Sequence, residues 1–382
     1  MVAANFLVVA ARMSVVTFLG IYFVRVAGID LATVGAAFLV ENLLRGVLAP
    51  VFGALSDRIG RRALLIPAAA FSAAALPCFL LVSGPASLFA WSMAIGVAGA
   101  VNMPVASALL LDLAPSERRQ AVLALNYTVM SVAYTLGVMP AGYVAERSYA
   151  VLAGASSVGF VLVALLYYIA LRSPLPLEQA RQAGMLRDTV SAFTDGTFLL
   201  FASLAVVFPL SMGLVVVASP VFAAELGLRE GYIGLVLGGN SIIVAALAVP
   251  IATRIEPAGP FRLLGASALL VAAAFACYAL VPGPAAALLA GTLVFSFGEL
   301  VFSSAVPAAV ARLAPAGRRG AYQGAWALVG SFAMGSALVL SSALREALGW
   351  PGAWLAYAGL ALAAAAALFA LRERLLRASQ NA

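Results

Sequence analysis

Long apolar runs dominate this sequence, and they constrain the fold more than any other feature. A helix needs about 20 apolar residues to cross the hydrocarbon core of a bilayer, and twelve runs of about that length alternate with short polar breaks. Only 10% of the 382 residues are charged, against about 25% in a soluble domain. We therefore predict an all-α membrane protein with twelve transmembrane helices. The expected spans are 5–26, 32–55, 63–83, 88–113, 121–145, 150–171, 197–224, 231–253, 262–281, 287–313, 320–344 and 351–371.

The breaks between spans predict the domain organisation and the orientation. A polar stretch over 172–196 interrupts the pattern after the sixth span. We expect an N-terminal six-helix bundle over 1–171, a cytoplasmic linker over 172–196, a C-terminal six-helix bundle over 197–371 and a cytoplasmic tail over 372–382. Most arginines fall in alternate loops, and the positive-inside rule places that side, with both termini, in the cytoplasm. The expected location is the cytoplasmic (inner) membrane. The opposite loops hold only Arg25, Arg147, Arg229 and Arg345.

The two halves repeat in sequence. Seven of the nine residues in 78–86 match or closely resemble those found 199 positions later, and Leu113-Ala114-Pro115 recurs 200 positions later. Shared turn residues at one offset indicate that a six-helix unit was duplicated in the same orientation. The sequence therefore predicts two pseudo-symmetric bundles.

Missing residue types exclude several function classes. The chain has no Lys and no His, so it offers neither a P-loop lysine nor a Schiff-base lysine. Cys78 and Cys277 stand alone in apolar segments and are expected to be small buried hydrophobic residues, not disulfide partners or zinc ligands. We expect no cofactor, no metal and no enzymatic chemistry. The formal charge of +7 follows from the loop arginines, so nucleic-acid binding is not expected.

Residues 53–62, between the second and third spans, read GALSDRIGRR. This segment resembles the loop signature of the major facilitator superfamily, in which a glycine and a small residue precede Asp-Arg-x-Gly-Arg-Arg. The glycines suit a close helix approach at Gly53 and a tight turn at Gly60, and Asp57 can pair with a helix N-terminus or an arginine. In the family this Asp latches one conformation through charges at nearby helix ends. The candidate latch residues are Gly53, Asp57, Arg58, Gly60, Arg61, Arg62 and Asp112, with simple solvation of a helix end as the alternative for Asp112.

The resemblance covers the full chain and implies alternating access by rocking of the two bundles. It loosely extends to drug:proton antiporter-type exporters. Those exporters commonly carry an arginine where Ser92 stands here, and their Gly- and Pro-rich motif in the fifth span is degraded in 137–142. These two departures leave the exporter subgroup less supported than the superfamily.

Polar residues inside the apolar spans give the candidate cavity. Arg12, Glu41, Arg45 and Glu299 fall at mid-depth by residue count, and the i,i+4 spacing predicts that Glu41 pairs with Arg45. That pairing leaves Arg12 and Glu299 in need of a partner or a substrate. The alternatives are mutually paired structural charges or proton binding at Glu299 or Glu41, with the arginines tuning it or meeting an anionic group. The further cavity candidates are Asn102, Asn126, Tyr134, Asn240, Gln323 and Trp326.

Spans 3, 6, 9 and 12 contain no charged residue apart from Arg262 at the first position of span 9, and they are expected to be peripheral. The combined expectation is a monomeric secondary active transporter that moves a small organic solute, coupled to protons, with membrane lipid around it. Proton-coupled efflux is the leading reading. A symporter or facilitator for uptake of a metabolite, organic anions included, is the alternative. A channel is not favoured, because the sequence shows no repeated filter sequence. A sensor or scaffold is not favoured either, because the sequence shows no sizeable soluble domain.

Overall fold

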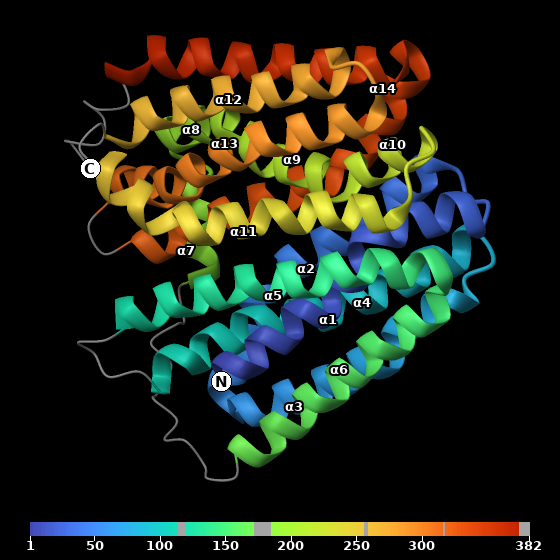
Figure 1. The fold of residues 1–382 in the computed structure, drawn as a ribbon. Helices are drawn as coiled ribbons and strands as arrows, with labels where there is room; N and C mark the ends of the chain where they lie inside the picture. Colours follow the sequence, from blue (N-terminus) through green and yellow to red (C-terminus); the bar gives the residue numbers. More distant parts are fainter. Residues whose placement is uncertain (114–118, 172–184, 256–258, 316–317, 374–382) are drawn as a thin grey trace. The chain divides into compact units, whose positions relative to one another are not determined.

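The computed structural model describes residues 1–113, 119–171, 185–255, 259–315 and 318–373, and within these ranges every regular element is helical (Figure 1). The helices are α1 (Val2–Ile21), α2 (Leu31–Ile59), α3 (Arg61–Ala75), α4 (Pro85–Leu113), α5 (Arg119–Arg147), α6 (Tyr149–Ala170), α7 (Met185–Ala192), α8 (Gly196–Ala205), α9 (Val207–Gly213), α10 (Ser219–Glu225), α11 (Glu230–Ile255), α12 (Pro260–Leu280), α13 (Pro284–Leu313) and α14 (Arg319–Ala370). Helix-like turns of other pitch extend α1 over Tyr22–Val26, extend α3 over Leu76–Leu81 and join α9 to α10 over Leu214–Ala218.

The described residues contain 11 helical segments long and apolar enough to cross a membrane. The last of them, α14, is 52 residues long and is broken at Gly349, where φ is 68° and ψ is 172°. Only glycine adopts such a backbone readily, so α14 consists of two helical segments, 319–348 and 350–370. Counting those two segments separately confirms the predicted all-α fold with twelve spans.

Local chemistry explains several helix ends. Asp30 caps α2 by accepting a hydrogen bond from the backbone N–H of Thr33 at 2.8 Å. Ser148 caps α6 in the same way, and Asp195 caps α8 through the N–H groups of residues 197 and 198. Such caps satisfy N–H groups that have no partner within the helix. They allow long apolar helices to begin sharply after loops of only a few residues.

The backbone repeats the duplication seen in the sequence. Gly28 and Gly227 both have positive φ, and so do Gly60 and Gly259; each pair is separated by the 199 positions of the sequence repeat. α4 and α13 likewise begin at Pro85 and Pro284, again 199 residues apart. The turns that end corresponding loops are therefore conserved between the halves of this chain.

The chain divides into two compact units. Unit 1 consists of Met1–Gln182 together with Gly227–Ile242, and unit 2 consists of Ala183–Leu226 together with Ile243–Ala382. Unit 1 holds an aromatic cluster in which Phe23 lies within 5.6 Å of Trp91 between ring centroids. In unit 2 the fully buried Trp354 lies 4.7 Å from Tyr278 between ring centroids.

The local structure refines two expectations, and a third, the burial of the cysteines, is wrong. The motif segment is helical up to Ile59, so Gly60 alone forms the break between α2 and α3. Within the expected linker, 185–192 form the helix α7, where Thr189 is buried, whereas 172–184 lie outside the described residues. Cys78 is exposed and Cys277 half-buried, and both are free thiols. An apolar run marks a span but does not show which face of the helix turns inward.

Candidate functional site

The centre of unit 1 contains two arginines that share one carboxylate oxygen. Nη2 of Arg12 donates to Oε1 of Glu41 at 2.6 Å, and Nη2 of Arg45 donates to the same oxygen at 2.5 Å. The side chain of Glu41 is 4% exposed, while those of Arg12 and Arg45 are 12% and 22% exposed. The predicted Glu41–Arg45 pair is confirmed. Arg12 finds its partner in the same carboxylate, because its long side chain reaches from α1 to α2, and this agrees with the alternative of mutually paired charges.

Close packing of α4 on α2 places this cluster. A Cβ atom on Gly96 would lie 2.8 Å from the backbone oxygen of Glu41, and one on Gly99 would lie 3.1 Å from Nε of Arg45. A contact under 3 Å cannot exist without movement of the backbone, so Gly96 is required for this helix approach. One turn further along α4, Gly99 leaves the space that the Arg45 side chain occupies. Small residues commonly allow such approaches between membrane helices.

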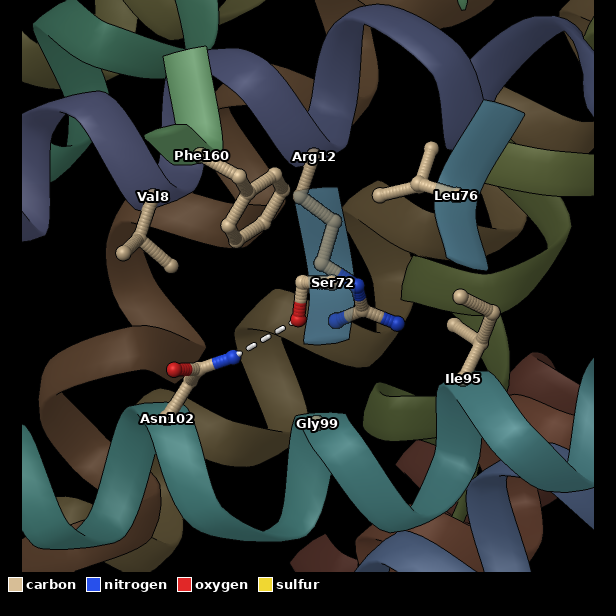
Figure 2. Close-up of a pocket in the computed structure, with 8 residues that line it drawn as sticks. All are labelled: Val8, Arg12, Ser72, Leu76, Ile95, Gly99, Asn102 and Phe160. Carbon is tan, nitrogen blue, oxygen red and sulfur yellow. Dashed lines mark hydrogen bonds between the residues drawn. The ribbon is translucent and has the colours of Figure 1, made fainter. Parts of the chain in front are cut away.

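A small cavity adjoins the cluster (Figure 2). The guanidinium of Arg12 enters it from α1, while Ser72 and Asn102 reach it from α3 and α4. The space open to the centre of a water-sized sphere is about 20 Å³, which is enough for one water molecule. The remaining lining residues are Val8, Leu76, Ile95, Gly99 and Phe160.

Asn102 gives the cavity an unsatisfied acceptor. Its Nδ2 donates to Oγ of Ser72 at 3.2 Å, and Oγ of Ser72 donates to the carbonyl of Ala68 at 2.8 Å. Oδ1 of Asn102 is buried and has no hydrogen-bond partner among the residues that the structure describes. A buried unpaired amide oxygen costs free energy, so it indicates a place where a donor group binds.

Spans 3 and 6, which were expected to be peripheral, each turn a few side chains toward the interior of unit 1. Ser72 of α3 bonds to Asn102, and Phe160 of α6 lines the same cavity. In addition, Oγ of Ser156 on α6 donates to the carbonyl of Ala11 at 2.6 Å. A charge-free helix can still contribute small polar groups to an interior, and residue charge alone did not reveal them.

A second polar contact in unit 1 joins α1 to α5. Nδ2 of Asn5 donates to Oδ1 of Asn126 at 2.8 Å, and both side chains are buried. Nδ2 of Asn126 lies 3.3 Å from the sulfur of Met130. The sequence predicts Asn126 as a cavity residue. It does not single out Asn5, although Asn5 is also an amide inside an apolar run. Tyr134 and Asn240, also in unit 1, are half-buried.

Unit 2 holds the remaining candidates. Glu299 on α13 is 9% exposed, and it follows Gly298, whose carbonyl accepts a hydrogen bond from Oγ of Ser267 at 2.8 Å. Nε2 of Gln323 donates to the carbonyl of Pro307 at 3.0 Å. The ring of Trp326 lies 5.7 Å from that of Phe201. These contacts place Gln323 and Trp326 in the packing of α14 against its neighbours.

The motif residues form a compact set of contacts around the α2–α3 break. Nη1 of Arg61 lies 2.7 Å from Oδ1 of Asp57, and Nη1 also donates to Oγ of Ser56. Gly60 has φ of 92°, a conformation that suits glycine. Arg62 donates to the carbonyl of Leu171 at 3.0 Å, and its guanidinium lies 5.2 Å from the ring centroid of Tyr168.

The remaining motif residues are Gly53, Arg58 and Asp112. A Cβ on Gly53 would meet no atom within 4 Å, so the expected close helix approach is absent there among the described residues. Arg58 is exposed. Asp112 lies in the last turn of α4, but its side chain falls outside what the structure describes. Among the described residues, no group of three or more His, Cys, Asp or Glu side chains could hold a metal ion.

The sequence of this chain matches known proteins over its whole length and over a shorter segment. The sequence model of the "Major Facilitator Superfamily" matches residues 1–210 and 200–382. A "Na(+), Li(+), K(+)/H(+) antiporter" from Planococcus maritimus is 32% identical over 127 residues, which span 31% of this chain and only 29% of that protein.

Solved structures share the fold at low sequence identity. The nucleoside transporter NupG superposes with a TM-score of 0.81 at 14% identity, covering 97% of each chain. A POT family transporter in complex with 5-aminolevulinic acid gives 0.77 at 15% identity, covering 97% of this chain and 95% of that one. The human organic anion transporter MFSD10 gives 0.67 at 18% identity, covering 96% and 98%. With the family model matching both halves, this chain belongs to the Major Facilitator Superfamily of transporters.

Proposed function

We propose that this protein is a proton-coupled secondary active transporter that exports a small organic solute across the cytoplasmic membrane by alternating access. The family supports transport by two repeated bundles. The coupling ion and the direction of transport rest on the separate observations that follow. The choice of the cytoplasmic membrane rests on the distribution of arginines among the loops.

The observation that carries proton coupling is the burial of Glu299. Among the described residues, the buried acidic side chains are Glu41 and Glu299. Glu41 forms ion pairs with two arginines at once, so removal of its charge would leave two adjacent cations inside unit 1. Glu299 is the better candidate to gain and lose a proton during the cycle, because ionisable groups within spans commonly form proton relays.

Export is supported by the likeness to the "Na(+), Li(+), K(+)/H(+) antiporter" from Planococcus maritimus. The likeness covers less than a third of either chain, and both sequence departures from the exporter pattern stand. The outward direction therefore rests on that relative and on the loose resemblance of the motifs.

One observation favours the alternative, uptake of an organic anion by a symporter or facilitator. The Arg12, Glu41 and Arg45 cluster contains two cations and one anion, and a buried excess of positive charge favours an anionic solute. The alternative differs from the main proposal in the charge of the solute and in the direction of transport.

The test uses the full-length protein in proteoliposomes with a panel of organic cations, neutral solutes and organic anions. Each solute is measured with an imposed pH gradient, with no gradient, and in counterflow with unlabelled solute inside. Proton-coupled export predicts accumulation of one solute class in vesicles that are acidic inside, where protons leave in exchange. Accumulation only when the outside is acidic would establish symport instead, and counterflow that ignores pH would establish a facilitator. Absence of exchange for the whole panel would contradict transport of these solute classes.

A further inference from the structure

We propose that the cavity beside Arg12, Glu41 and Arg45 is a binding site for one small monovalent anion, preferably a carboxylate that carries a neighbouring hydroxyl or amino donor. The ligand could be a free anion or the anionic end of the transported solute. Only the second version rests on the proposed function; binding itself does not.

The charge balance gives the sign and the valence of the ligand. Arg12 and Arg45 contact the single carboxylate of Glu41, and neither arginine makes a second ion pair among the described residues. The other acids of unit 1 whose partners are known lie elsewhere: Asp57 pairs with Arg61, and Glu146 accepts from the N–H of Gly231. One positive charge is therefore uncompensated at a largely buried position. A single negative charge balances it, whereas a dianion would exceed it.

The arginines have donors to offer. A guanidinium carries five N–H groups, and each arginine uses one nitrogen, Nη2, on Glu41. Nε of Arg45 is buried and has no hydrogen-bond partner within the described part of the chain, and it lies against Gly99, a residue of the cavity wall. Arg12 itself lines the cavity and enters it from the side opposite Gly99 (Figure 2). Arginine forks match the geometry of a carboxylate well.

Asn102 gives the preference for a ligand with its own donor. Asn102 as a residue is 4% exposed, and its Oδ1 is unpaired among the described residues. In the structure Oγ of Ser72 accepts from Nδ2 of Asn102 and donates to the carbonyl of Ala68, so the Nδ2 side of the amide is satisfied and the Oδ1 side faces no donor. A hydroxyl or ammonium beside the carboxylate would satisfy this oxygen. A halide or a simple carboxylate such as acetate would not.

The cavity limits the size of the bound group. About 20 Å³ is open to the centre of a water-sized sphere, and the walls formed by Val8, Ile95 and Phe160 are apolar. The enclosed space holds about one water-sized group, so one oxygen of the anionic end fits between these walls and the rest of the ligand requires the walls to move. A larger solute would extend beyond the cavity.

The test measures binding to the purified full-length protein in detergent, with no gradient imposed. Thermal unfolding is followed while glycolate, acetate or bromide replaces sulfate at constant ionic strength. We expect glycolate to raise the unfolding temperature at lower concentration than acetate or bromide. Arg45→Gln leaves the Arg12–Glu41 pair intact and neutral, and it should weaken the apparent affinity for all three anions by about tenfold or more. Arg12→Gln should do the same.

Two variants serve as controls. Arg25→Gln removes one charge at an exposed position of the same unit and should respond like the wild type. Asn102→Ala should lose the preference for glycolate over acetate while still binding both. Equal stabilisation by sulfate, or a wild-type response in both Arg45→Gln and Arg12→Gln, would overturn the proposal.

A transport arm separates the two sources of the anion. If labelled glycolate exchanges across proteoliposome membranes in counterflow, the site binds the end of a transported solute. If glycolate binds but does not exchange, the site binds a free anion. Failure of binding would leave proton-coupled transport of another solute intact, because that is measured separately with a pH gradient.

Discussion

Asp30 shows, at the scale of a single residue, how one side chain begins a membrane helix. It accepts from the N–H of Thr33 at 2.8 Å, and these hydrogen bonds lower the pKa of the Asp30 carboxyl below its usual value of 3.8. A lowered pKa in the folded state means that the ionised cap stabilises α2 above the usual pKa. That contribution is lost as the pH falls through the lowered value.

We predict that Asp30→Ala destabilises the protein by about 1 kcal/mol at neutral pH, since α2 loses its cap. Asp30→Asn retains an acceptor and should cost less. Thermal unfolding in detergent at several pH values checks both. The difference between wild type and Asp30→Asn should shrink below pH 3.8; a difference that stays constant from pH 7 to pH 3 would contradict the role of the charge.

The buried charges show what could be predicted from the sequence and what could not. The i,i+4 spacing of Glu41 and Arg45 fixes their pairing within one helix, and the structure confirms it at 2.5 Å. Arg12 joins the same oxygen from another helix, and nothing in the local sequence says which helices are neighbours. The same reason hid Ser72 and Asn5, whose partners lie 30 and 121 residues away.

At the scale of the helix, spans were easier to predict than their faces and ends. Apolar length indicated every span, because the bilayer sets a minimum length. Helix ends moved by several residues, as α2 shows by continuing through the motif to Ile59. The close approach expected at Gly53 instead occurs at Gly96, where α4 meets α2.

We predict that Gly96→Ala destabilises unit 1 by about 1–3 kcal/mol, because the new methyl group would overlap the backbone oxygen of Glu41. Gly154→Ala, in α6, is the matched control, since a Cβ there meets no atom within 4 Å. Gly154→Ala should be neutral or slightly stabilising. Unfolding temperatures of the two variants in the same detergent provide the comparison, and equal values would show that α4 does not need a glycine at position 96.

At the scale of the whole molecule, the duplicated units and the motif contacts support a conformational cycle. Family membership gives the repeated architecture, and the repeated positive-φ glycines give matching turns in each half. Asp57 contacts Arg61 at 2.7 Å at the α2–α3 break. A charge pair at such a break can stabilise one state of the cycle more than another.

We predict that Asp57→Asn slows solute exchange in proteoliposomes by tenfold or more while folded protein still inserts, because the variant loses the charge of the proposed latch. Solute affinity in detergent should change little, since Asp57 lies apart from the cavity residues. Wild-type turnover in this variant would rule out the latch. A parallel loss of affinity would instead indicate a role in the binding site.

Glu299→Gln tests the central claim of proton coupling most directly, because it removes titration while keeping the size and the hydrogen-bonding capacity of the side chain. Glu346→Gln, an exposed change in the same unit, is the control. In proteoliposomes, Glu299→Gln should lose accumulation driven by a pH gradient yet retain solute exchange at equal pH on both sides, and Glu346→Gln should retain both. If Glu299→Gln still accumulates solute against its gradient when protons alone supply the driving force, Glu299 is not the coupling site.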